Sequence, residues 1–145
     1  MKSLTYSFDD VSFRFISTMT GVSDFNGDGL GTITIKSTIN PTELLSSADG
    51  QTMTLKQVGS RAEFSVTTPQ VSSLAKRLMN NYMLLSKANS TVWNTNQAII
   101  THSGSGLRMT LTFVSYKLPP EVVFTKEGQF MEFNFVAESM NVICI

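Results

Sequence analysis

Residues 131–138 read MEFNFVAE, and along this stretch apolar and polar side chains alternate one by one. The apolar set is Met131, Phe133, Phe135 and Ala137, and the polar set between them includes Glu132, Asn134 and Glu138. Successive side chains of a β-strand point to opposite faces of its sheet. The alternation therefore predicts a strand that buries an aromatic face in a core and turns a polar face outward.

The same period of two recurs along most of the chain. The apolar residues of the further stretches are Leu4, Tyr6 and Phe8; Val11, Phe13 and Phe15; Ile33, Ile35 and Ile39; Met53 and Leu55; Ala62, Phe64 and Val66; and Leu107, Met109, Leu111 and Phe113. Six or seven strands are expected, mostly antiparallel where short turns join them. The segments 40–57 and 88–96 are expected to be exposed connections.

One segment departs from this period and has the spacing of an amphipathic helix. Its apolar residues fall at i, i+3, i+4, i+7, i+8, i+11 and i+14, namely Val71, Leu74, Ala75, Leu78, Met79, Tyr82 and Leu85. Thr68 is expected to cap the helix, and Pro69 to occupy its first turn, where no backbone N–H is needed. Of the stripe, Val71, Leu74, Leu78, Met79 and Tyr82 are predicted to face the core.

These patterns predict the fold class. The chain should be mainly β, an antiparallel β-sandwich or partial barrel with one flanking amphipathic α-helix. A length of 145 residues suits one domain, so residues 1–145 are expected to share a single core. Thr, Ser and Asn outnumber Lys and Glu on the polar strand faces, which fits the wet interior of a barrel or pore and equally an ordinary sheet with a polar face.

The charge content narrows the classes of function. Charged residues make up 15% of the sequence, where about 25% is typical of soluble domains, and eleven basic side chains balance eleven acidic ones. A neutral, weakly charged surface favours association between protein molecules. It argues against a dedicated nucleic-acid binder, since such a protein needs clustered Lys and Arg to neutralise phosphates.

The sequence carries no signal for export or for a membrane span. Asp9 and Asp10 stand where a signal peptide would need its apolar core, and no apolar run approaches the roughly 18 residues of a transmembrane helix. Cys144 is the only cysteine, so no intrachain disulfide is possible. A single thiol is consistent with folding in a reducing cytoplasm.

The segment SDFNGDGLGTITI, residues 23–35, imitates a calcium-binding loop. Asp24, Asn26, Asp28 and Gly29 occupy its first, third, fifth and sixth positions, but the twelfth, which needs a bidentate Glu, is Ile35. The segment also leads into a predicted strand where a calcium loop would lead into a helix. We therefore expect a glycine-rich turn and no metal site.

His102 is the only histidine, and it stands beside Ser103 in the segment ITHSGSG, residues 100–106, where we expect a strand end. The nucleophile elbow of serine hydrolases requires glycine two residues before and after the serine. Here those positions are Thr101 and Ser105. The sequence therefore predicts no catalytic residue, no cofactor and no enzyme activity.

Several short features follow one another in a fixed order. They are YSFDDVSF at residues 6–13, the turns at 28–29 and 48–50, the predicted helix at 69–85, and YKLPPEVVFTKEGQFMEFNF at 116–135 with its double proline at 119–120. In this order the chain resembles the tail tube proteins of phages with contractile tails. The resemblance covers most of the chain and rests on the order of the features more than on any single motif.

The resemblance implies a structural subunit whose copies form hexameric rings and stack into a hollow conduit for DNA delivery. The implied partners are further copies of the chain, tail sheath, tape measure and baseplate proteins, and DNA that passes through the lumen without specific binding. It implies a place in the virion tail after assembly in the bacterial cytoplasm, with no membrane contact. The alternatives are the tube protein of a related contractile injection or type VI secretion system, and a monomeric β-sandwich binding module.

The long connection NPTELLSSADGQTMTLKQ, residues 40–57, holds Leu44 and Leu45 side by side and carries three charged residues, Glu43, Asp49 and Lys56. A solvated hairpin relies on charged side chains to discourage edge pairing with other chains. We therefore expect its exposed groups to be covered by the next subunit or ring, and its ordering to await assembly. The candidate inter-ring or inter-subunit contacts are Pro41, Leu44, Leu45, Asp49, Met53 and Leu55.

Overall fold

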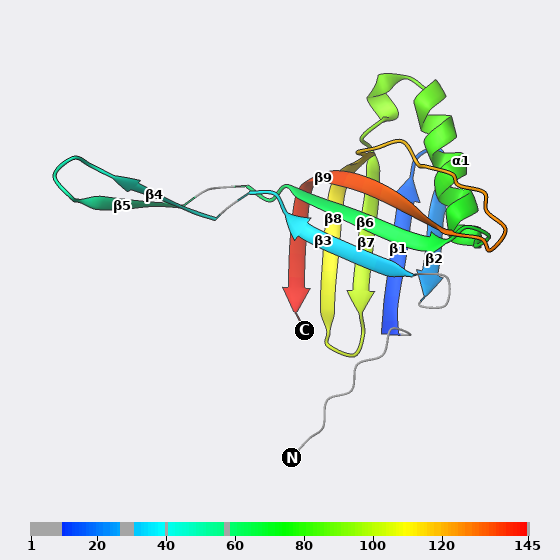
Figure 1. The fold of residues 1–145 in the computed structure, drawn as a ribbon, viewed down its shortest axis with the longest axis horizontal. Coiled ribbons are helices and arrows are strands. Elements are labelled where there is room, and N and C mark those ends of the chain that lie inside the picture. Colours follow the sequence, from blue (N-terminus) through cyan, green and yellow to red (C-terminus); the bar gives the residue numbers. More distant parts are fainter. Residues whose placement is uncertain (1–9, 27–30, 40, 57–58, 145) are drawn as a thin grey trace, which may run out of the picture.

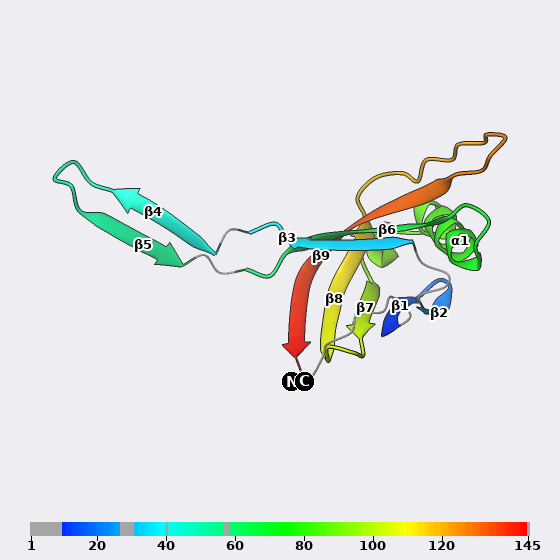
Figure 2. The ribbon, with the colours of Figure 1, turned by 60° about the horizontal axis from the view of Figure 1, so that its bottom comes forward.

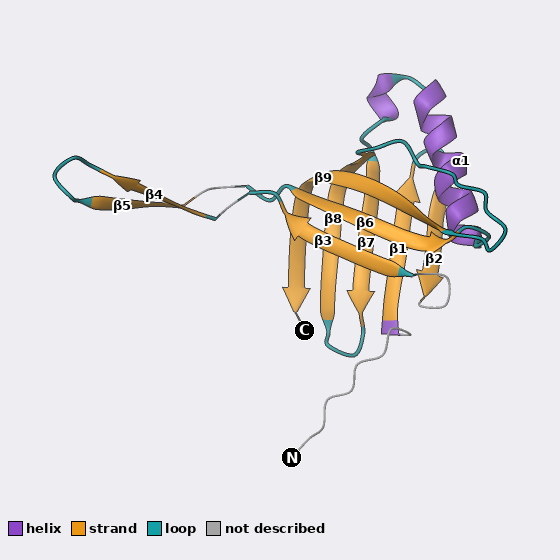
Figure 3. Cartoon of the chain, in the orientation of Figure 1, coloured by secondary structure: helices purple, strands orange, loops and turns teal. Residues whose placement is uncertain are grey.

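A computed structural model describes residues 10–26, 31–39, 41–56 and 59–144 of the chain. Seven strands form one antiparallel sheet in the order β2-β1-β7-β8-β9-β6-β3, and β4 and β5 form a separate hairpin (Figures 1 and 3). The strands are β1 (Val11–Ser17), β2 (Gly21–Asn26), β3 (Thr32–Ser37), β4 (Thr42–Ser46), β5 (Thr52–Lys56), β6 (Ala62–Pro69), β7 (Asn96–His102), β8 (Leu107–Tyr116) and β9 (Phe130–Cys144). The strand predicted around residues 4–8 lies outside the described residues.

The sheet bends along the strand β9, so that its two halves form two layers. Residues 130–137 of β9 pair with β6, whereas residues 135–144 pair with β8, so one strand belongs to both halves of the sheet. Figure 2 shows β3, β6 and the first part of β9 lying across the remaining strands. The predicted mainly β fold, of sandwich or partial-barrel type, is confirmed. The seven described strands of this sheet leave β2 and β3 as edges and do not close a barrel.

Phenylalanine rings from both layers meet in the core. Phe13 of β1 lies 6.5 Å from Phe64 of β6 between ring centroids, and Phe15 of β1 lies 5.7 Å from Phe135 of β9. Phe64 and Phe135 stack at 4.8 Å. Each large apolar side chain buried in this way stabilises the fold by about 1.5–3 kcal/mol. The alternation predicted for β1, β6 and β9 is confirmed by this core.

The flanking helix α1 (Ser73–Lys87) is also confirmed, but it begins later than predicted. Ser72 is its N-cap, and the Ser72 hydroxyl accepts a hydrogen bond from the backbone N–H of Ala75 at 3.2 Å. The predicted cap Thr68 and the predicted first helical residue Pro69 instead end β6, where they pair with β9. Strand pairing therefore outweighs the local helix-start signal.

The later start changes the role of Val71. It lies before the helix with 85% of its surface exposed, so its predicted core-facing position is wrong. Leu74 and Leu78 are buried as predicted, and Met79 and Tyr82 are half-buried against the core. A short 3-10 helix, η3 (Ser90–Val92), follows in the connection to β7. No helix in the described part of the chain is long and apolar enough to cross a membrane.

A buried polar network fastens α1 to the sheet. The Tyr116 hydroxyl of β8 lies within donating distance of the Leu78 carbonyl oxygen, at 2.9 Å, and of the Asn81 side-chain oxygen, at 2.8 Å. The Asn81 amide nitrogen donates to the Ser17 hydroxyl at 2.7 Å and to the Thr20 hydroxyl at 3.0 Å. Burial raises the pKa of the Tyr116 phenol, so its proton stays available for donation.

A bulge in β8 overturns the prediction that Phe113 shares a face with Leu111. Asn96 of β7 pairs with Val114, whereas Gln97 pairs with Thr112, so Phe113 is an extra residue on β8. It has a φ of 53° and is 55% exposed, while Val114 is fully buried. A bulge redirects the side chains that follow it, so Val114 points into the core in place of Phe113.

Leu78 tests whether the helix stripe is core. Leu78→Ala should lower the free energy of unfolding by about 2–5 kcal/mol, because it removes buried surface and leaves a cavity. Met83→Ala, on the exposed side of α1, should change it by no more than about 0.5 kcal/mol. Urea denaturation of both variants measures the difference. An unchanged midpoint for Leu78→Ala together with impaired assembly would assign the stripe to a partner.

Replacing Phe113 by glycine or by alanine tests the bulge, because the positive φ predicts that the glycine variant is the more stable of the two. At ordinary strand positions glycine is less stable than alanine by roughly 0.5–1 kcal/mol. At a positive φ the order reverses, because only glycine adopts this conformation without steric cost. Phe113→Gly should therefore be more stable than Phe113→Ala by about 1 kcal/mol in urea denaturation. The opposite order would mean that β8 has no left-handed residue at this position.

Candidate functional site

The β4–β5 hairpin projects from the two-layer body as an arm, defined here as residues 41–56 (Figures 1 and 2). Its two strands pair only with each other, in a register that joins Thr42 to Lys56 and Ser46 to Thr52. All arm residues are exposed except Leu55, which is half-buried. The alternation of Met53 and Leu55 was predicted to mark a half-buried strand, and within a single chain this strand has no body to pack against.

The register sorts the arm's side chains onto two faces. Leu45 pairs with Met53, and Leu55 pairs with Glu43, so these four side chains share one face. Leu44 pairs with Thr54 and lies on the opposite face among Thr, Ser and Lys side chains. The arm is therefore amphipathic, with three large apolar residues gathered on a face that its own chain leaves open.

Hydrogen bonds hold the tip of the arm in a tight turn. The Gly50 backbone N–H donates to the Ser47 carbonyl oxygen at 3.1 Å, and Gly50 adopts a φ of 87°, which favours glycine. The Asp49 carboxylate accepts hydrogen bonds from the Ser47 hydroxyl and from the Gln51 backbone N–H. These bonds lower the pKa of Asp49 and keep its carboxylate ionised.

The structure places the predicted contact residues at different parts of the arm. Leu45, Met53 and Leu55 form its apolar face, Leu44 lies on the polar face, Asp49 is at the tip and Pro41 is at the base. Leu44 and Leu45 are neighbours in sequence but point to opposite sides. Sequence reasoning placed all six on one connection but did not separate the faces, because the pairing register was unknown, and their role as contacts stays a prediction.

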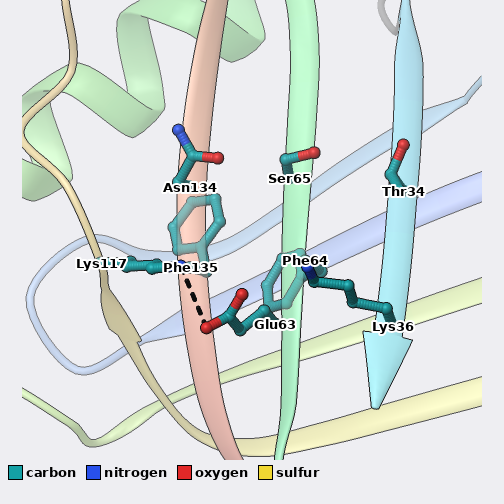
Figure 4. Close-up of a pocket in the computed structure, with 8 residues that line it drawn as sticks. All are labelled: Thr34, Lys36, Glu63, Phe64, Ser65, Lys117, Asn134 and Phe135. Atoms are coloured by element: carbon teal, nitrogen blue, oxygen red, sulfur yellow. Dashed lines mark ion pairs between the residues drawn. The ribbon is translucent and has the colours of Figure 1, made fainter. Parts of the chain in front are cut away.

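The outer face of the β3-β6-β9 layer is polar and balanced in charge (Figure 4). Lys117 forms an ion pair with Glu63 at 3.0 Å beside Lys36, above a shallow depression of ≈ 280 Å³. Small-molecule sites usually measure about 300–1,000 Å³ and are mainly apolar. Ser65 and Asn134 also line this depression. The site therefore has the character of a wet surface more than of a ligand pocket.

The outer face of the other layer is polar too. Arg14 of β1 forms an ion pair with Asp24 of β2 at 2.6 Å, and this partner raises the pKa of the Arg14 guanidinium. Most remaining side chains on this face are uncharged and polar, including Ser12, Gln97, Thr101, Thr110, Thr112, Ser139 and Asn141. The face also carries the apolar residues Ile16, Val22, Ile99 and Ile143 and the exposed Arg108. The Thr-rich strand faces noted in the sequence thus lie on the outside of a single chain.

The two decoy motifs take ordinary structural positions. Asp24, the first residue of the calcium-like pattern, is engaged by Arg14, and Asp28 and Gly29 lie outside the described residues. His102 ends β7, and its Nδ1 lies 2.8 Å from the Ser105 hydroxyl in the turn to β8. Within the described ranges, no group of three or more His, Cys, Asp and Glu side chains has the arrangement of a metal site.

The sequence matches a family model along nearly its whole length. The match is to the bacteriophage PhiTE tail tube protein and spans residues 3–144. The chain belongs to this tail tube family. The resemblance to phage tail tube proteins is thereby confirmed. No curated protein sequence matches the chain.

Solved structures with the fold of this tail tube protein come from related assemblies. One is the anti-feeding prophage cap, the AFP tube terminating cap, with a TM-score of 0.63, 7% identity, and coverage of 100% of this chain and 94% of that one. Another is a chain of the PVC sheath-tube complex of an extracellular contractile injection system in its extended state. Its TM-score is 0.57 at 9% identity, with coverage of 92% and 88%. At such identities the likeness concerns the fold alone.

The tail tube protein should show different local stabilities in its arm and body. An isolated two-stranded hairpin is only marginally stable in water. Hydrogen exchange on the free subunit should therefore find little protection for the amides of β4 and β5, whereas those of β6 and β9 exchange slowly through global unfolding. Equal protection in arm and body would show that the arm is ordered without a partner.

Proposed function

We propose that this chain is the repeating subunit of a tail tube, which stacks as hexameric rings into a hollow conduit for DNA delivery. The observation that carries the proposal is the projecting arm, whose apolar face formed by Leu45, Met53 and Leu55 stays uncovered in a single chain. Exposed apolar surface of this kind marks a contact with another protein molecule. In a tail tube family member, the natural partner is a second copy.

Sheet edges offer the contacts within a ring. The seven-stranded sheet ends in β2 on one side and β3 on the other, and each presents backbone N–H and C=O groups that no described strand pairs. Open edges are templates for strand pairing between chains. Different edges that meet in a head-to-tail manner close a ring when the rotation between copies divides a full turn. The hexameric number follows from the tail tube resemblance.

The polar outer face of the β1-β2-β7-β8 layer suits a DNA conduit. DNA carries one negative charge per roughly 1.7 Å of its axis, so a strongly basic lumen would bind it and slow its passage. Here Arg14 is paired with Asp24, Arg108 adds a single further positive charge, and Thr, Ser, Asn and Gln side chains make up most of the rest of the face. We propose that this face lines the lumen and contacts DNA without specific binding.

The remaining partners follow from a place in the tail. A tail sheath would surround the tube. The PVC sheath-tube complex, one chain of which has the same fold as this protein, supports this arrangement. Tape measure and baseplate proteins would meet the tube inside and at its end. The proposed role is structural, without catalysis, in a virion tail that assembles in the host cytoplasm.

A second candidate function is a tube subunit of a contractile injection system that delivers protein. One structural neighbour is a chain of the PVC sheath-tube complex of an extracellular contractile injection system, and the other is the anti-feeding prophage cap. The two candidate functions differ in the cargo of the tube, which is DNA in a phage tail and protein in an injection system. Purified particles that contain this chain and DNA packaged in a capsid would identify a phage tail, whereas headless particles would identify an injection system.

Deleting the arm tests its role in stacking. Replacement of residues 44–53 by a short Gly-Ser turn should leave a folded, soluble protein, because the arm contributes no side chain to the core. The variant should fail to form tubes in negative-stain microscopy, and light scattering should show no species beyond a monomer or single ring. Thr54→Ser, on the polar face of an intact arm, is the control and should form tubes. Normal tubes from the deletion would refute a stacking role.

A further inference from the structure

We infer that the end of the body opposite the arm receives the arm of a second copy. The receiving surface, the distal patch, consists of Val71, Phe124 and Phe130. These side chains are 85%, 86% and 64% exposed, which is unusual for large apolar residues in a chain with an ordinary core. The inference rests on the proposed stacking function and names the surface on which the stacking contact is made.

The distal patch has a fixed base. The Gln70 backbone N–H donates to the Gln129 carbonyl oxygen at 3.0 Å, and the Gln70 side chain donates to the Val123 carbonyl oxygen at 3.0 Å. These bonds join the turn before α1 to the segment between β8 and β9. A receiving surface that is already ordered loses less conformational entropy when a partner binds.

The ring of Phe130 lies over a bare stretch of backbone. A Cβ atom at Gly31 would meet the Phe130 ring at 3.3 Å and the Thr67 carbonyl oxygen at 2.7 Å, so glycine is required for this close approach. Beside the ring, Pro69, Val71 and Phe130 line a groove of ≈ 260 Å³ together with Gln70, Glu127 and Gln129. An apolar centre with polar residues at its margin is the usual make-up of a contact between protein molecules.

The chain path places the arm and the distal patch at opposite ends of the body. The arm connects the end of β3 to the start of β6, and β6 then runs the length of the layer to Pro69, next to Val71 (Figure 1). Its eight residues span roughly 26 Å at about 3.3 Å per residue. A second copy shifted along this direction would present its patch to the arm of the first.

Other exposed apolar residues fit the arm less well. Phe113 borders Thr38 and Arg61, which lie at the root of the chain's own arm, so it is on the wrong end for head-to-tail stacking. Met83 and Leu84 of α1 lie at the same end of the body as the segment between β8 and β9 (Figure 1), but they are only 43% and 38% exposed. The distal patch is the more exposed apolar surface at that end, at 64–86%.

This pairing is heterologous, since each copy offers one arm and one patch that do not overlap. A heterologous contact that does not close on itself continues as an open stack. The arrangement therefore accounts for a stack that extends along one axis. It also predicts that copies lacking only an arm and copies lacking only a patch can still join each other once.

Complementation of two variants tests the pairing. The arm variant carries Leu45→Asp and Met53→Asp, and the patch variant carries Val71→Asp and Phe124→Asp, all at exposed positions that should leave the fold intact. Circular dichroism and urea denaturation check that the fold is retained. Neither variant alone should form tubes. Mixed after purification, they should give a species of twice the mass of either and nothing longer in light scattering, whereas Met83→Asp with Leu84→Asp should form tubes like the wild type.

Two outcomes separate failure of the inference from failure of the function. Wild-type protein that forms no tubes at any concentration would refute the proposed function and this inference with it. Wild-type tubes accompanied by equally good tubes from the patch variant, or a mixture with no mass above its components, would refute the inference alone.

Cysteine pairing gives an independent readout that tolerates a partly disturbed fold. In a Cys144→Ser background, Met53→Cys combined with Val71→Cys, treated with a short thiol-specific cross-linker, should give a ladder of covalent multimers from assembled protein. Each single cysteine variant should give at most cross-linked dimers. A double variant that assembles into tubes but yields no ladder would overturn the proposed contact.

Discussion

The continuous strand β9 is the constraint on which the rest of the structure depends. Because residues 130–137 pair with β6 and residues 135–144 pair with β8, the sheet must fold across this strand into two layers. The stack of Phe64 on Phe135 sits at the crossing and fills the space between them. Once the fold across β9 is set, β2 and β3 become the free edges, and the arm and the distal patch are placed at opposite ends of β6.

The polar network around Asn81 controls how firmly the helix joins this frame. A buried amide is costly unless its donors and acceptor are satisfied, and here Tyr116 and Ser17 satisfy it from two different strands. The helix start then sets the turn that carries Gln70 and Val71. The bonds from Gln70 to Gln129 and Val123 hold this turn, so the helix and the proposed distal patch are fixed by separate sets of hydrogen bonds.

The sequence predicted those elements whose period is set by one core. The alternation around Phe13, Phe64 and Phe135 and the stripe of α1 from Leu74 to Leu85 were correct because each segment shows its buried face by itself. The failures all involve a second segment. Pro69 ends a strand because β9 pairs with it, Phe113 leaves the core because β7 imposes a bulge, and the two faces of the arm follow from the register of β4 on β5.

The strand β2, within the segment expected to be a glycine-rich turn, is held by β1 and shows little pattern of its own. Asn81 escaped notice because a polar residue on a helix is ordinarily assigned to solvent.

The division between body and arm separates folding from assembly. The body buries its large aromatic residues internally, so it gains stability without a partner. A hairpin of two five-residue strands cannot bury its apolar face alone. Leu45, Met53 and Leu55 therefore add little to the stability of one copy, and their burial becomes available only when a second copy supplies the other surface. The arm carries three charged residues: Asp49 at the tip, Lys56 on the polar face and Glu43 on the apolar face. A contact that buries the apolar face must therefore pair Glu43 or leave it at the rim, because a buried unpaired carboxylate is costly. The low charge of the whole sequence, 15%, fits a surface that neighbouring copies cover in the proposed tube.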